Sequence, residues 1–429
     1  MRLPPDHPLR LALNEEVHAR PPEALSPPLR LTFLAMYSDP RLRDRERERE
    51  HVAVLAGRYG VQPPPEGASH FSADLGAFRL KWERHSEFAR YKFIVAGPSA
   101  DPFADPALAV VPADWLAGLP GTVMVATHAV LLTADVLEPD IERLSARLFA
   151  GNVLVGAGIA GGAGTAFTDF RLHDGFGRLL LLDRGMSQRQ AGRMMQRLLE
   201  IDIYRLMALL ALPVAQGLTP WLNDAERELA QISAALVDST ETDEPALLDR
   251  LTRLEAQIES RESENHYRFT AAAAYHELVQ RRIEELREVR IQGLQTFHEF
   301  TERRLAPAMA TCRSVAGRIE SLSQRVARAT QLLSTRVDVS RERQNQQVLA
   351  SMNRRAAAQL RLQQTVEGLS VAAITYYIVG LLSYAAKGLV AAGLPLDAEL
   401  ATAASIPLVA LAVAWGVRKV RRRVTGADR

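Results

Sequence analysis

The chain has 429 residues and a formal net charge of +2, with 24% charged and 47% hydrophobic residues. This length suits two or three domains, and the near-neutral charge argues against a nucleic-acid partner. One cysteine, Cys312, excludes an internal disulfide and fits a reducing compartment. Prolines in the first ten residues, MRLPPDHPLR, replace the apolar core that a secretory signal needs, so we expect none.

Residues 1–215 predict a cytoplasmic α+β domain. Apolar, β-branched runs predict strands at 29–37, within 77–95 and at 121–132. A hairpin is expected around the turn dipeptide Asp174-Gly175. Helices are expected from about 41 to 59, after 138 and from 187 to 213, the last with a capping box from Ser187 to Gln190.

Three glycines, Gly156, Gly158 and Gly161, show the G-x-G-x-x-G spacing of dinucleotide-binding turns, and Asp183 follows at a tolerable distance. That motif requires a helix after the turn. Here the following residues, IAGGAGTAFTDF, are rich in glycine and threonine, which disfavour a helix. We therefore expect a bulged or closely packed strand, and a nucleotide-dependent enzyme using this loop is the alternative.

Other chemical motifs are absent from the sequence, so no catalytic residue, metal site or cofactor is predicted. His266, His276 and His298 do not have the spacing of helical metal ligands. Two polar clusters, NEEVHARPP (14–22) and WERHSEF (82–88), suit either acid–base chemistry or ion pairs and domain contacts.

Residues 216–367 predict a helical hairpin and coiled-coil stalk. Pro245 and Pro307 divide it into helices at about 222–237, 246–304 and 308–390. The third helix passes without a break into an apolar segment, and Asn353, Gln364 and Thr375 recur on it every eleven residues. Such a polar seam suits a solvated face, antiparallel packing on the second helix or the wet centre of an oligomer.

Residues 368–417 predict a two-span transmembrane hairpin. The segments 368–386 and 400–417 have no charged residue, and about 20 apolar residues cross a bilayer core. Basic residues precede the first span and follow the second, whereas the link AAGLPLDAE between the spans has none. This asymmetry places both termini in the cytoplasm. The basic tail, 418–429, is expected to contact anionic lipid headgroups. Its basic residues nearest the membrane are Arg418, Lys419, Arg421, Arg422 and Arg423.

Five stretches together resemble a bacterial family of uncharacterised, predicted membrane-anchored proteins. They are HPLRLALNEEVHARPP, KWERHSEF, TDFRLHDGF, QRLLEIDIYRLMALLALP and QLRLQQTVEGLSVAAITYYIVGL. The resemblance covers nearly the whole chain. It implies membrane attachment and no specific activity; separately, we expect the membrane to be the bacterial inner membrane.

The layout is also similar to that of the CorA-type magnesium channels, although the Gly-Met-Asn tripeptide of that family is absent here. This similarity implies a homo-oligomer, a pentamer, with Mg²⁺ or another divalent cation as the ion. Asn353, Gln364 and Thr375 would then face a pore, and Asp397 and Glu399 would line its outer mouth. An ion-permeation or ion-sensing assembly and a membrane-tethered scaffold or regulator are thus the two leading functions.

Overall fold

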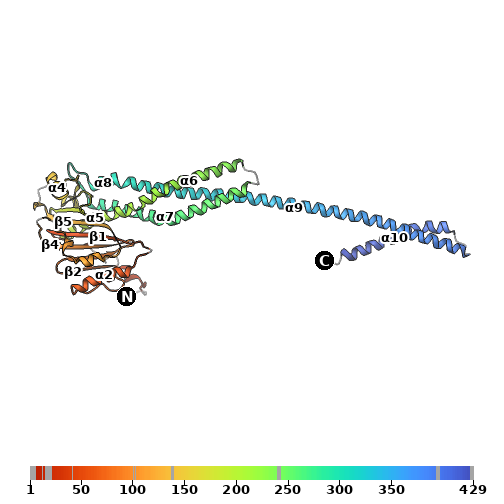
Figure 1. The fold of residues 1–429 in the computed structure, drawn as a ribbon, viewed down its shortest axis with the longest axis horizontal. Coiled ribbons are helices and arrows are strands. Elements are labelled where there is room, and N and C mark those ends of the chain that lie inside the picture. Colours follow the sequence, from red (N-terminus) through yellow and green to blue (C-terminus); the bar gives the residue numbers. More distant parts are fainter. Residues whose placement is uncertain are drawn as a thin grey trace, which may run out of the picture. The chain divides into compact units, whose positions relative to one another are not determined.

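A computed structural model describes residues 6–11, 13–14, 22–40, 42–99, 101, 103–136, 140–238, 243–392 and 397–425. The fold is α+β, as predicted: an N-terminal sheet is followed by long helices (Figure 1). The described strands form one sheet of nine, in the order β2-β3-β4-β1-β5-β8-β7-β6-β9. Pairing is antiparallel throughout except between β5 and β8.

Eight of these strands lie where alternating or apolar runs occur in the first half of the chain. Their bounds are β1 (Leu29–Tyr37), β2 (His70–Asp74), β3 (Arg79–Arg84), β4 (Phe88–Ala96), β5 (Thr122–Thr133), β6 (Val155–Ile159), β7 (Gly164–Thr168) and β8 (Gly177–Asp183). The predicted hairpin around Asp174-Gly175 is confirmed, because β7 and β8 pair antiparallel across it.

One face of the sheet packs on short helices through aromatic and aliphatic side chains. Trp82, Tyr91 and Phe93 point to this face and form a buried cluster with Val52 and Leu55 of α2 (Arg45–Arg58). The helices α3 (Ala113–Ala117) and α4 (Ile141–Leu148) cover the same face further along the sheet. Each large apolar side chain buried here contributes about 1.5–3 kcal/mol, so this layer is the main hydrophobic core.

The opposite face of the sheet is covered by α5 (Gln188–Leu209). Ser187 caps this helix by accepting a hydrogen bond from the Gln190 backbone N–H, which is one of the two bonds of the predicted capping box. The segment before β1 lies tightly across α5: a Cβ at Gly192 would approach the Glu23 carbonyl oxygen to 1.6 Å. Glycine at this position therefore permits the contact.

Two long helices follow, α6 (Ala211–Asp238) and α7 (Glu244–Leu286). The prediction of one helix over 246–304 is wrong. Residues after Leu286 leave the helix and form β9 (Val289–Arg290), which pairs with β6 at the sheet edge. A short helix, α8 (Phe297–Arg304), then begins with a capping box between Thr296 and Glu299.

The last two helices are α9 (Ala306–Ala391) and α10 (Ala398–Thr425). α9 is one uninterrupted helix of 86 residues. The chain divides into two compact units, one of residues 1–237 and 249–329 and one of residues 238–248 and 330–429. α9, which lies in the second unit from residue 330 on, and α10 are each long and apolar enough to cross a membrane, and their apolar stretches are not buried inside the structure.

Candidate functional site

Charged side chains of β3 and β4 point away from the aromatic core, toward α5. Lys81 and Glu83 alternate with Leu80 and Trp82 along β3, and the same alternation places Arg90 and Lys92 on this face of β4. These four charged residues are at most 4% exposed. A buried charge is costly unless it is paired, so its partners determine what this region can do.

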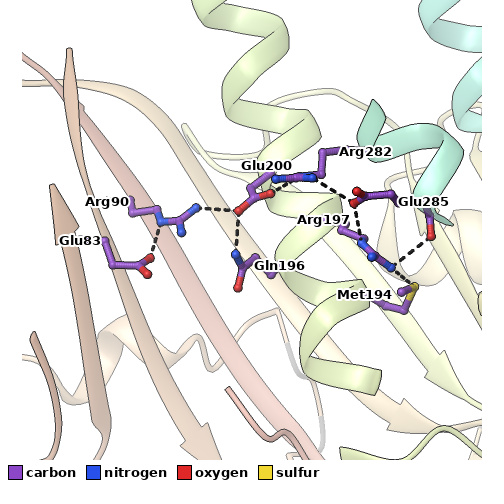
Figure 2. Close-up of polar contacts among 8 residues, drawn as sticks. All are labelled: Glu83, Arg90, Met194, Gln196, Arg197, Glu200, Arg282 and Glu285. Carbon is purple, nitrogen blue, oxygen red and sulfur yellow. Dashed lines mark hydrogen bonds and ion pairs between the residues drawn. The ribbon is translucent and has the colours of Figure 1, made fainter. Parts of the chain in front are cut away.

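Arg90 is the centre of the resulting network (Figure 2). Its Nε donates to Glu83 Oε2, and its Nη1 donates to Glu200 Oε1 of α5 at 3.0 Å. Glu200 also accepts hydrogen bonds from Gln196 Nε2 at 2.7 Å and from Arg282 Nε of α7 at 2.5 Å. One carboxylate on α5 therefore joins the sheet to α7.

The network continues to the end of α7. Arg282 Nη1 and Arg197 Nε both donate to Glu285 Oε2, at 3.0 and 2.9 Å. Arg197 Nη1 also donates to the Glu285 carbonyl oxygen at 3.1 Å (Figure 2). This anchors the last turn of α7 just before the chain enters β9.

A second clasp joins the β3–β4 turn to α7. The guanidinium of Arg268 donates to both oxygens of Glu87, at 2.6 and 3.1 Å. Paired charge-assisted bonds of this kind fix orientation as well as distance. The cluster 82–88 thus supplies domain contacts through Glu83 and Glu87, one of the two interpretations that its composition allowed.

Burial and neighbouring charges shift the pKa values in opposite directions along the network. Burial raises the pKa of Glu83, but Arg90, Lys92 and Lys81 outweigh it and bring that pKa to about 2. The pKa of Glu200 is likewise lowered, because Arg90 and Arg282 outweigh its burial. Both carboxylates are therefore ionised at neutral pH.

Lys92 differs, because burial and the adjacent Arg90 lower its pKa to about 7. A cavity of about 10 Å³ lies beside it, lined also by Glu23, Gly192 and Gln196. That volume is close to the minimum for one water molecule, and it leaves no room for a substrate. The buried Gln196 Oε1 in this lining accepts no hydrogen bond within the described chain. Chemically, the arrangement is a clasp of ion pairs that spans β3, β4, α5 and α7.

The glycines of the G-x-G-x-x-G stretch lie in a closely packed strand. Gly156 and Gly158 belong to β6, and the turn containing Gly161 leads into β7 rather than into a helix. A Cβ at Gly156 would approach Phe167 Cδ1 to 2.7 Å, and a Cβ at Gly158 would approach the Val289 Cβ to 3.2 Å. The strands on both sides of β6 thus account for these two glycines.

Asp183 ends β8 and organises the turn that follows. Its Oδ1 accepts hydrogen bonds from the backbone N–H groups of Gly185 and Met186, at 2.9 and 2.7 Å. The structure therefore does not assemble Asp183 with the glycines around a helix N-terminus, the geometry that a bound dinucleotide uses.

The three polar residues expected to line a pore lie on α9. Asn353 and Gln364 are exposed, and Thr375 is half-buried and donates to the Val371 carbonyl oxygen at 2.7 Å. Whether they face an axis depends on further copies of the chain, so that expectation stays a prediction.

The residues expected at the membrane surfaces lie on or next to α10. Asp397 caps the helix by accepting hydrogen bonds from the N–H groups of Glu399 and Leu400, at 3.0 and 3.3 Å. Glu399 is exposed in the first turn, and Arg418 lies near the other end. Lys419 Nζ lies 4.6 Å from the centre of the Trp415 ring. The side chains of Arg421, Arg422 and Arg423 lie outside the described residues, as does most of the 14–22 cluster.

His266 and His276 line a separate groove of about 690 Å³ between α7 and α9, together with Cys312. Burial raises the pKa of the Cys312 thiol, which makes it a poor nucleophile. No three histidine, cysteine or carboxylate side chains gather as metal ligands among the described residues.

Arg90, Lys92, Glu200 and Arg282 were missed as members of a site. The available signal was the alternation in FARYKF, where two cations share one face of an otherwise apolar strand. Glu200, which accepts from Arg90, lies 110 residues further along the chain, and its position depends on how α5 packs on the sheet.

A family model described as "Protein of unknown function (DUF3422)" matches residues 5–424, nearly the whole chain. This confirms the resemblance drawn from the five stretches; the match makes no statement about CorA-type channels. No curated protein matches the chain.

Proposed function

The chain belongs to the DUF3422 family, and we propose that it is a membrane-tethered scaffold or regulator. In this proposal, α9 and α10 form a transmembrane hairpin in the bacterial inner membrane. The sheet, α6 and α7 lie in the cytoplasm, where they bind protein partners, and the chain is a homo-oligomer.

The observation that supports this function best is the exposure of the apolar parts of α9 and α10. Leu381 and Tyr384 of α9 and Leu411 of α10 are 70–78% exposed. Apolar side chains gain free energy on leaving water, at about 25 cal/mol per Å². Two helices that expose them along about 20 residues suit a hydrocarbon environment.

The orientation follows from the basic residues. Arg354, Arg355 and Arg361 precede the first apolar segment, and Arg418 and Lys419 follow the second. The positive-inside rule then places both ends in the cytoplasm.

The ionic network supports a binding or regulatory role over an enzymatic one. Glu83, Arg90, Glu200 and Arg282 are paired with one another, and the cavity beside Lys92 admits about one water. The network also joins β4, α5 and α7 through Arg90, Glu200 and Arg282, so the sheet and these two helices are held together and can present a constant surface.

Membrane attachment is tested by fractionating cells that express the full chain and a variant ending at Gln364. We expect the full chain to stay in the membrane pellet after an alkaline wash, and the shortened chain to appear in the soluble fraction. A full chain that is freely soluble without detergent contradicts the proposal.

A second candidate, an ion-permeation or ion-sensing assembly, rests on the polar series Asn353, Gln364 and Thr375. The first two are exposed along α9, where copies around an axis would form polar rings. In this candidate a pentamer conducts Mg²⁺ or another divalent cation past Asp397 and Glu399. Magnesium flux into liposomes that contain the purified protein tests it, and its absence favours the scaffold.

A further inference from the structure

Among the described residues, α9 is exposed on nearly every side over the stretch that precedes the apolar segment, and one face of it is marked by a regular apolar series. Its members follow each other at alternating steps of four and three residues: Val348, Met352, Arg355, Gln359, Leu362, Val366 and Leu369. The five apolar members are 56–69% exposed. This alternation averages 3.5 residues, the repeat with which one helix packs along another.

The same face continues into the apolar segment. After Leu369 come Ala373, Tyr377, Gly380 and Tyr384, again at steps of three or four. Tyr377 is 71% and Tyr384 78% exposed, and no atom lies within 4 Å of a Cβ built on Gly380. Coverage is partial on both sides here, since Gly380 of this face and Val371 and Thr375 of the other side are half-buried.

We propose that this face, from Val348 to Tyr384, packs in parallel against the same face of a second copy of the chain. The occupant must be a helix that passes from water into lipid, because the face does so. It must also be longer than α10, which has 28 residues. The α9 of another copy meets both conditions, and it runs parallel because the bilayer orients both chains alike. The inference rests on the membrane anchoring proposed above.

The residues that flank the seam favour identical partners. At the positions next to the apolar series, Gln344, Ser351, Ala358 and Thr365 lie on one side and Leu349, Ala356, Gln363 and Ser370 on the other. None of these is charged, so like-charge repulsion between two parallel copies is confined to Arg355 within the seam itself.

Inside the bilayer, small and polar residues give the seam its attraction. Ala373 and Gly380 let two backbones approach, and the hydroxyls of Tyr377 and Tyr384 find hydrogen-bond partners across the contact that lipid tails do not offer.

Outside the bilayer, Arg355 is the one charged member of the seam, and its long side chain reaches water at the edge of the seam.

This seam and the pore-facing arrangement exclude each other. Val366 and Gln364 are two residues apart, which is about 200° around a helix. If Val366 faces the second copy, then Gln364 faces away from it. Asn353 and Thr375 lie on the same side as Gln364.

Cysteine cross-linking in isolated membranes distinguishes the two. The native cysteine is first removed by Cys312→Ala, and Val366→Cys is compared with its matched control, Gln364→Cys. We expect mild oxidation to convert most of the Val366→Cys chain to a dimer and to leave Gln364→Cys at the background of the cysteine-free chain. Dimer from Gln364→Cys alone, or from neither variant, overturns the proposal.

A second measurement does not depend on oxidation. Val366→Glu and Gln364→Glu place the same charge on the two sides of α9, and the mass of each full chain is measured in mild detergent. We expect Val366→Glu to lower the oligomer fraction severalfold and Gln364→Glu to leave it unchanged; equal effects contradict the seam. Membrane pelleting of all variants is followed in parallel, because its loss would point to a failure of the anchor rather than of the seam.

Discussion

The sheet unit and the last part of α9 differ in which side chains they bury. The sheet unit buries charged side chains, whereas the last part of α9 exposes apolar ones. In the sheet unit, Glu83, Arg90 and Glu200 are buried, and each is paired with another residue of the same chain. In α9 beyond Ser340, apolar side chains such as Leu362 and Leu369 remain more than half exposed. The first region pairs these charges within one copy of the chain, whereas the second leaves its apolar side chains exposed in a single copy, and in the function proposed above lipid and a second copy cover them.

This difference shows where the stability of each region comes from. Mutations in the sheet unit should change the free energy of unfolding without regard to protein concentration or lipid. Mutations in α9 after Ser340 should change assembly and attachment instead. Substitutions in the sheet unit test the first of these expectations. Unfolding of the full chain in detergent can be followed through the buried Trp82 and Trp115.

The largest effect is expected from Glu200→Ala. The substitution leaves the Arg90 and Arg282 guanidiniums without their shared carboxylate, and breaking a buried ion pair in this way costs about 3–5 kcal/mol. The matched control is Asp224→Ala, which removes an exposed partner of Arg227. Urea unfolding of both variants measures the difference; equal stabilities would contradict the account of the network.

A smaller loss is expected from Gly156→Ala. The added methyl group would meet Phe167 and the Ala166 carbonyl oxygen closer than normal contact, and overpacking of this kind costs about 1–3 kcal/mol. As a control, Gly217→Ala in α6 has open space and should stabilise the helix by up to about 1 kcal/mol. A Gly156→Ala chain as stable as the parent would remove the packing explanation.

Lys92 should produce a pH dependence. Because its pKa falls from 10.5 to about 7 on folding, the unfolded chain binds more protons between those values. The free energy of unfolding therefore rises with pH across this window, by up to about 1.4 kcal/mol per unit. Lys92→Met should remove that slope between pH 7 and 9, and an unchanged slope in urea titrations would assign it to another group.

Local pattern was sufficient for most of the sheet. The strands around Phe33, Tyr91 and Leu180 were predictable because alternation or continuous apolar character shows within a few residues. The two apolar helices were predictable for the same reason. Each property belongs to a single segment and does not depend on what packs against it.

What the sequence did not reveal depends on long-range contact. Val289 and Arg290 follow a run of helix-forming residues, and they become a strand because the glycines of β6 offer an open edge. Glu200 and Arg282 look like ordinary surface charges of α5 and α7 until those helices pack on β4. In both cases the residue that fixes the local structure or the ion pair belongs to another element, far along the chain.

The place of β9 in the chain also sets an order of events during synthesis. β6 leaves the ribosome early, but its neighbour Val289 emerges only after α5, α6 and α7 have been translated. Until then the sheet has a bare edge that could pair with another nascent chain. The edge is closed before the apolar part of α9 is made, so we expect the sheet unit to fold before that part is translated.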